Sequence, residues 1–115
     1  MNVNKELMKG STAILILSLL EREEMYGYQI TQKLKQESND VFEMKEGTLY
    51  PMLHALENEK AIESYWVDAE NGKKRKYYRI TNSGKKLLSD KKKEWKVYTN
   101  AVNKVIGGVA FEQFA

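Results

Sequence analysis

Three side chains that can form hydrogen bonds, Tyr50, His54 and Asn58, recur on one side of a helix predicted over residues 48–60. The opposite side of that helix is apolar and carries Leu49, Met52, Leu53 and Leu56. An asparagine amide can pair with adenine through two hydrogen bonds, and tyrosine and threonine hydroxyls can bond phosphates. The polar side of the helix therefore has the chemistry of a surface that reads a nucleic acid.

The start of the same helix favours an anion. Its free backbone N–H groups and positive dipole end attract phosphate, and Lys45 and Thr48 are placed to assist. Pro51 lies on the polar side. Because proline is tolerated in the first turn of a helix, we expect Gly47 or Thr48 to be the N-cap.

Two other interpretations of this helix remain open. It can be an ordinary amphipathic helix whose outer face has no partner. His54 as a catalytic base is a weaker alternative, because it has no Asp, Ser or Cys neighbour in an orienting role. Glu57 and Glu59 oppose contact with DNA at the far end, so we expect contact in the first two turns.

A basic hairpin follows the helix. Two β-rich segments, residues 61–67 and 74–80, flank the turn signal Asn71-Gly72. Alternation places Arg75, Tyr77 and Arg79 on one face of the second strand. The tip and outgoing strand concentrate groups that suit phosphates, namely Lys73, Lys74, Arg75, Lys76 and Tyr77.

Charge and composition narrow the function classes. Residues 1–60 hold 7 Lys/Arg and 10 Asp/Glu, whereas residues 61–115 hold 12 and 6, so the positive charge gathers in the second half. A solvated surface is the alternative explanation of such a charge run. The chain has no cysteine and one histidine, which excludes a disulfide framework, a thiolate nucleophile and a His-cluster metal site. We therefore expect that the protein is not an enzyme and binds no cofactor.

The apolar run from Ala13 to Leu20 is too short to span a bilayer. No small-residue cleavage site follows it. We therefore expect a cytoplasmic protein without a membrane segment.

The order of the predicted elements defines the fold. Helices are expected near residues 5–22, 27–37 and 48–60, then the hairpin, then a long helix near residues 82–106 that begins after Thr81 and ends at Gly107-Gly108. Three helices and a hairpin describe a winged helix-turn-helix, in which the third helix enters the major groove of DNA. We predict a mostly α fold with a winged helix-turn-helix domain at residues 1–81 and a C-terminal dimerisation helix and tail at residues 82–115.

The long helix carries an apolar stripe that exceeds what a small body can cover. At about 1.5 Å per residue the helix spans about 37 Å. The stripe consists of Leu87, Leu88, Trp95, Tyr98, Val102, Val105 and Ile106. A second copy of the same helix is the simplest partner, which predicts a two-fold homodimer. Packing on the first helix of the same chain is the alternative.

Trp95 lies in the middle of the stripe, next to Tyr98. The two rings offer a stacking wall for a small planar aromatic ligand between subunits. The alternative is that Trp95 fills the core of the dimer.

Three motifs carry a resemblance to a known family: YGYQI at 26–30, EGTLYPMLHALE at 46–57, and GKKRKYYRIT at 72–81 followed by Gly84. In this order and spacing they are similar to those of the PadR family of bacterial transcriptional regulators. The resemblance implies a winged-helix homodimer whose recognition helix starts at Thr48 to Pro51 and whose wing includes Lys74 to Tyr78. Lys60 stands where many members have glycine.

Together these features predict a DNA-binding transcriptional regulator. We expect a repressor that binds double-stranded DNA as a homodimer and is released by a small aromatic or amphipathic effector. The alternatives are an effector-independent DNA-binding regulator and a winged-helix protein-interaction module.

Overall fold

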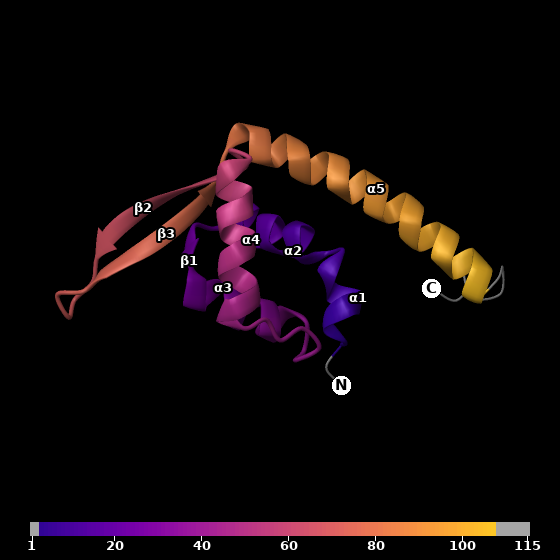
Figure 1. Ribbon diagram of the computed structural model, residues 1–115, viewed down its shortest axis with the longest axis horizontal. Coiled ribbons are helices and arrows are strands. Elements are labelled where there is room, and N and C mark those ends of the chain that lie inside the picture. Colours follow the sequence, from indigo (N-terminus) through magenta and orange to yellow (C-terminus); the bar gives the residue numbers. More distant parts are fainter. Residues whose placement is uncertain (1–2, 108–115) are drawn as a thin grey trace.

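The structure is a computed structural model that describes residues 3–107, except for the side chains of Lys5 and Glu6. Its elements are α1 (Lys5–Lys9), α2 (Thr12–Arg22), β1 (Met25–Tyr26), α3 (Gly27–Glu37), α4 (Glu46–Asn58), β2 (Ile62–Asp68), β3 (Lys74–Ile80) and α5 (Asn82–Ile106). Figure 1 shows a body of α1–α4, from which the β2–β3 hairpin and α5 extend in opposite directions. We call this hairpin the wing. The predicted winged helix with a long C-terminal helix is confirmed.

The predicted first helix is two helices. The expectation of one helix over residues 5–22 was wrong, because the chain breaks at Gly10 and Ser11. Glycine disfavours a helix interior, and the hydroxyls of Ser11 and Thr12 bond the Met8 carbonyl at 3.0 and 3.1 Å. The second piece, α2, is the predicted central helix, with four nearly inaccessible side chains: Ile16, Leu17, Leu19 and Leu20.

Helix α4 begins earlier than expected. Lys45, rather than Gly47 or Thr48, is its N-cap, so Pro51 lies in the second turn and not the first. An acidic residue at the helix start, Glu46, interacts favourably with the helix dipole and extends the helix toward its N-terminus. Pro51 has no N–H to donate to the carbonyl of Gly47, and Gly47 is an exposed residue.

A tight C-terminal turn ends α4. The Lys60 N–H donates to the Glu57 carbonyl and the Ala61 N–H donates to the Leu56 carbonyl, both at 2.9 Å, which is the Schellman pattern. Lys60 supplies its left-handed residue, with φ of 65°. The turn therefore adopts a conformation that glycine suits best.

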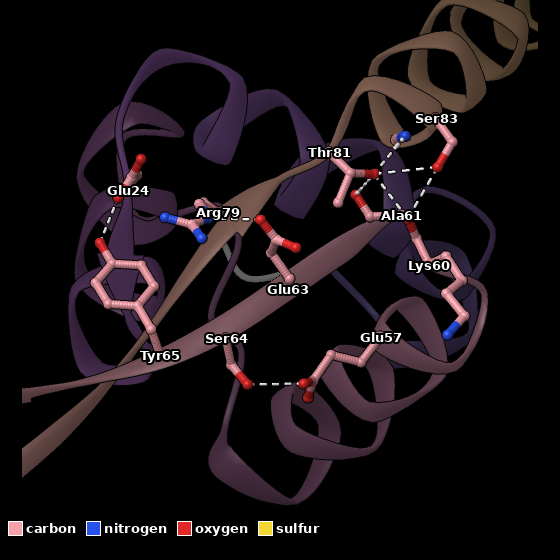
Figure 2. A network of polar contacts seen from close by, with 11 residues as sticks. Glu24, Glu57, Lys60, Ala61, Glu63, Ser64, Tyr65, Arg79, Thr81 and Ser83 are labelled. Atoms are coloured by element: carbon pink, nitrogen blue, oxygen red, sulfur yellow. Dashed lines mark hydrogen bonds and ion pairs between the residues drawn. The ribbon is translucent and has the colours of Figure 1, made fainter.

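The same turn anchors the start of α5, as Figure 2 shows. The Thr81 hydroxyl accepts a hydrogen bond from the Gly84 N–H at 3.0 Å and donates one to the Lys60 carbonyl at 2.7 Å. Thr81 is therefore the N-cap of α5, as predicted. Ser83 donates to the same carbonyl at 2.9 Å. Gly84 is buried, and a Cβ there would collide with the Ala61 carbonyl oxygen. The beginning of α5 is thus fixed to the junction between α4 and the wing.

The sheet has a third strand that was not expected. Its order is β1-β3-β2, all antiparallel, and the short β1 pairs Met25 with Tyr78. The wing register pairs Ser64 with Tyr78 and Trp66 with Lys76. The Tyr78 side chain is 1% exposed and joins the sheet to the core.

Helix α5 matches its predicted range over 82–106, with Gly107 as its C-cap. Gly108 and the rest of the predicted tail lie outside the described residues. The first half packs on the body, where Lys92 lies 3.9 Å from Glu21 of α2. The radius of gyration is 16.1 Å, against about 13 Å for a compact chain of this length, because the second half projects. The predicted domain boundary at residue 81 remains a prediction.

Candidate nucleic-acid interface

The outward face of α4 carries the predicted polar residues. Leu49, Leu53 and Leu56 are buried, while Thr48, Tyr50, Pro51, His54 and Asn58 are exposed, as is the N-cap Lys45. The amphipathic division of this helix is confirmed. The structure therefore leaves one side of α4 open to a partner.

Tyr50 lies between α4 and α3. Gly27, the buried first residue of α3, has no side chain, and a Cβ there would run into the Tyr50 hydroxyl. The phenol ring consequently lies over the start of α3, and the Tyr50 side chain remains 37% exposed. Its hydroxyl lies close to the N-terminus of α3, where an anion is favoured.

The wing has two faces with different surroundings. Because side chains alternate along a strand, Ser64 and Trp66 of β2 share a face with Lys74, Lys76 and Tyr78 of β3. We call this the inner face, because it is the one attached to α4. Burial of the Tyr78 hydroxyl, followed by the nearby Glu57 carboxylate, raises its pKa above the usual range.

Glu57 joins the inner face to α4. Its carboxylate accepts a hydrogen bond from the Ser64 hydroxyl at 2.7 Å, and the Lys76 ammonium lies 3.9 Å away (Figure 2 shows the Ser64 bond). The open side of α4 and the inner face of the wing thus form one continuous surface. Two contacts from a single carboxylate fix the angle between them.

Lys76 is half-buried at this joint. Its ammonium lies 6.0 Å from the centroid of the Trp66 ring and 5.7 Å from that of Tyr78. Lys73 and Lys74, by contrast, are exposed. They stand at the predicted turn, where Gly72 has φ of 78° and Asn71 accepts from the Lys73 N–H at 3.1 Å. These two lysines are the wing cations best placed to reach a polyanion.

Arg75 and Tyr77 lie on the other face of the wing, away from α4. The Tyr77 ring packs between those of Tyr26 and Tyr65, with centroid distances of 5.4 and 5.8 Å. The Arg75 guanidinium lies 4.6 Å over the Tyr26 ring. The structure therefore does not bring these two predicted contacts together with the α4 surface.

The same outer face carries one polar contact to the body and one between β2 and β3, both drawn in Figure 2. The Tyr65 hydroxyl donates to Glu24, and this bond raises the Tyr65 pKa above its ordinary value. Arg79 donates to Glu63 at 2.7 Å, which raises the pKa of the guanidinium further. The first contact ties β2 to the segment before β1, and the second joins β3 to β2.

The predicted dimer stripe divides into two parts. Leu88 is 1% exposed and Leu87 packs against the same core, so the start of the stripe is covered by its own chain. Val102 is half-buried. Four later residues are exposed by 38 to 86%: Trp95, Tyr98, Val105 and Ile106. Packing within the same chain thus accounts for the start of the stripe, and the dimer stays a prediction for the exposed remainder.

A groove of about 500 Å³ runs beside Trp95. It is lined from the body by Leu7, Gly10 and Ile14 and from α5 by Lys91, Glu94, Trp95 and Tyr98. The Trp95 and Tyr98 rings lie 5.9 Å apart, tilted by 35°. The groove offers an aromatic wall with one cation and one carboxylate at its rim.

Sequence reasoning missed Trp66, the Glu57–Ser64 bond and Gly27. Strand alternation could have placed Trp66 on the inner face, because it is two residues from Ser64. The other two depend on how distant segments pack, which has no local signal. In the part of the chain that the structure describes, no helix is long and apolar enough to cross a membrane, and no group of three acidic or histidine side chains could hold a metal ion.

Comparisons with known proteins agree with this geometry. Residues 16–90 match the transcriptional regulator PadR-like family. A transcriptional regulator from Clostridium thermocellum has 34% identity and a TM-score of 0.83, over 89% of this chain and 99% of that one. A PadR family regulator from Eggerthella lenta has 33% identity and a TM-score of 0.79, over 89% and 87%.

A curated relative adds a functional name. The negative transcriptional regulator PadR of Bacillus subtilis is 35% identical over 75 residues, which cover 65% of this chain and 41% of that protein. The present chain thus spans less than half the length of that relative. With the family matched over residues 16–90 and the winged helix in place, the chain belongs to the PadR-like family of transcriptional regulators.

Proposed function

We propose that this regulator represses transcription by binding double-stranded DNA through the open side of α4 and the inner face of the wing. The observation that carries the proposal is the continuity of these two surfaces through Glu57, with exposed Lys73 and Lys74 at the far end. A helix in the major groove with a wing on the adjacent backbone is the docking geometry that this surface fits. Repression is supported by the likeness to the Bacillus subtilis negative regulator.

The position of each residue on α4 or the wing suggests which part of the DNA it contacts. His54 and Asn58 face outward along α4 and reach base edges, where the asparagine amide selects adenine. Asn58 carries the proposed contact beyond the first two turns expected from the sequence, because Glu57 is engaged by Ser64 and Lys76 instead of facing the duplex unpaired. Phosphates are bound by the groups at the start of α4 and at the wing tip, namely Lys45, Thr48, Tyr50, Lys73 and Lys74. We keep Pro51, Arg75, Lys76 and Tyr77 as secondary contacts, because Pro51 has no donor and the other three are engaged within the protein.

Selection of bound duplexes from a random pool, followed by footprinting upstream of the protein's own gene, tests this proposal. Asn58→Ala should weaken binding to the selected site by about 1–3 kcal/mol and binding to random DNA much less. Transcription from a promoter that overlaps the site should fall when the protein is added. Absence of salt-dependent duplex binding would instead favour a protein-interaction module.

We also propose a homodimer formed by the exposed second half of α5. Tyr98, Val105 and Ile106 leave 60 to 86% of their surface uncovered by the described part of the chain. A two-fold pair would cover them and present two α4 helices to half-sites about 34 Å apart. The relatives named above come from bacteria, where DNA lies in the cytoplasm, and we propose the same compartment for this protein.

The groove beside Trp95 is the proposed effector site, with Trp95 and Tyr98 stacking a small planar aromatic compound. Such a ligand releases DNA when it binds better to a dimer whose α4 helices no longer match adjacent grooves. Planar cations and phenolics should quench tryptophan emission in a Trp66→Phe variant, which retains Trp95 of the two tryptophans. Trp95→Ala should abolish binding while the dimer persists.

Two results would contradict the effector proposal. If no planar compound quenches Trp95 and DNA binding is unaffected by all of them, the protein is an effector-independent regulator. If Trp95→Ala yields monomers, Trp95 belongs to the dimer core.

A further inference from the structure

Trp66 is the largest exposed side chain of the wing. Its side chain is 63% exposed, although an indole is costly to leave in water. It follows Tyr65 in β2, and its cross-strand partner is Lys76. Since folding leaves most of this ring uncovered, its packing within the chain does not account for it.

The position of Trp66 relates it to α4. Ser64, two residues earlier on the same face, bonds Glu57 of α4. Lys74 and Lys76 of β3 share that face, and the Lys76 ammonium lies 6.0 Å from the Trp66 ring centroid. Trp66 is therefore on the inner face. It lies one position farther from α4 than Ser64 on that face, beside the lysines of β3.

The surroundings select the kind of partner. A purely apolar protein surface would have to desolvate the neighbouring lysines without pairing them, which is unfavourable. The partner must therefore offer an apolar surface to the Trp66 ring and negative charge to the lysines, and a sugar–phosphate backbone offers both. Its deoxyribose edges are apolar and suit a ring face, and its phosphates suit the lysines and the indole N–H.

We propose that Trp66 packs against the sugar–phosphate backbone that the wing follows, with its ring on a deoxyribose and its N–H toward the adjacent phosphate. The proposal rests on the DNA-binding function argued above. The contact is independent of sequence, because sugar and phosphate are the same at every base pair. It carries no net charge and thus releases no counterion.

This combination predicts a distinctive result. Trp66→Ala should weaken binding about tenfold, or about 1.4 kcal/mol, on the selected site and on random duplex alike. The salt dependence of binding should stay the same, unlike the effect of removing a lysine. Trp66→Phe, which keeps a ring without the N–H, should recover part of the affinity. Val67→Ala is the matched control, because Val67 neighbours Trp66 on the outer face and is 38% exposed.

Tryptophan emission supplies a second readout. Duplex DNA should change the emission of the full chain and leave that of Trp66→Phe unchanged. Two results together would overturn the inference: Trp66→Ala binds DNA as tightly as the unmodified protein, and Trp66→Phe still changes its emission when DNA is added. A loss confined to the selected site, or a salt slope lowered by about one, would overturn it too. Failure of the unmodified protein to bind any duplex would refute the proposed function instead.

Discussion

Lys60 occupies the left-handed position of the turn that ends α4, with φ of 65°. In this region of backbone conformation, a residue with a Cβ is less stable than glycine by about 1–2 kcal/mol. Lys60→Gly should therefore raise the free energy of unfolding by about 1 kcal/mol, after allowance for the greater freedom of glycine in the unfolded chain. Urea unfolding measures the change. Lys60→Ala is the control, because it removes the long side chain and keeps the strain, and it should bring no such gain.

Tyr78 makes stability depend on alkaline pH. Burial raises its pKa in the folded state above the ordinary value of about 10. Above pH 10 the unfolded chain therefore loses this proton first, so the free energy of unfolding falls as pH rises toward the folded pKa. Urea unfolding at pH 8, 10 and 11 should show a shallower decline for Tyr78→Phe than for the unmodified protein. Equal declines would mean that Tyr78 ionises alike in both states.

At the scale of elements, Gly84 fixes the start of α5. An added methyl would collide with the Ala61 carbonyl, which is backbone and cannot rotate away. Gly84→Ala should lower the free energy of unfolding by about 1–3 kcal/mol or more, as overpacking does. Gly47→Ala is the matched helical control, because a Cβ at Gly47 meets nothing within 4 Å. It should stabilise α4 by up to about 1 kcal/mol. Similar effects of the two changes in thermal unfolding would contradict this reasoning.

The sequence predicted the elements that have local signals. Residues 27–37, the Asn71-Gly72 turn and the Thr81 cap matched the structure, because periodicity, turn chemistry and capping are properties of neighbouring residues. The break between α1 and α2 was missed because it needs the hydroxyls of Ser11 and Thr12 to compete for one carbonyl. Strand β1 was missed because two residues have no period, and they pair only once β3 is beside them.

The candidate site was predicted in the same uneven way. The open side of α4 follows from helical spacing, and the exposure of His54 and Asn58 bears it out. The wing residues were grouped as phosphate contacts, although alternation already placed Arg75, Tyr77 and Arg79 together on one face. The structure confirms that shared face, and what the sequence left out is that it lies away from α4. The hydrogen bond between Ser64 and Glu57 joins a strand to a helix, and no spacing rule in the sequence relates those two residues.

At the scale of the whole molecule, the exposed end of α5 governs assembly. Val105 and Ile106 are 86 and 74% exposed on the stripe, whereas Val97 is 71% exposed on the opposite side of the helix. Val105→Asp with Ile106→Asp should produce monomers that keep their helix content, because a charge in an apolar interface is costly. Sedimentation measures the mass, and Val97→Asp should remain dimeric. A monomeric unmodified protein would contradict the proposed dimer.

The central claim is that α4 and the wing form one surface for duplex DNA, with phosphates held at the wing tip. The direct measurement is the salt dependence of duplex binding for the unmodified protein, for Lys73→Gln with Lys74→Gln, and for the charge-matched control Lys93→Gln with Lys96→Gln on α5. The wing variant should bind every sequence more weakly and lose about two units of salt slope, while the control keeps the full slope. Equal slopes for all three proteins would remove the wing from the interface and contradict the account.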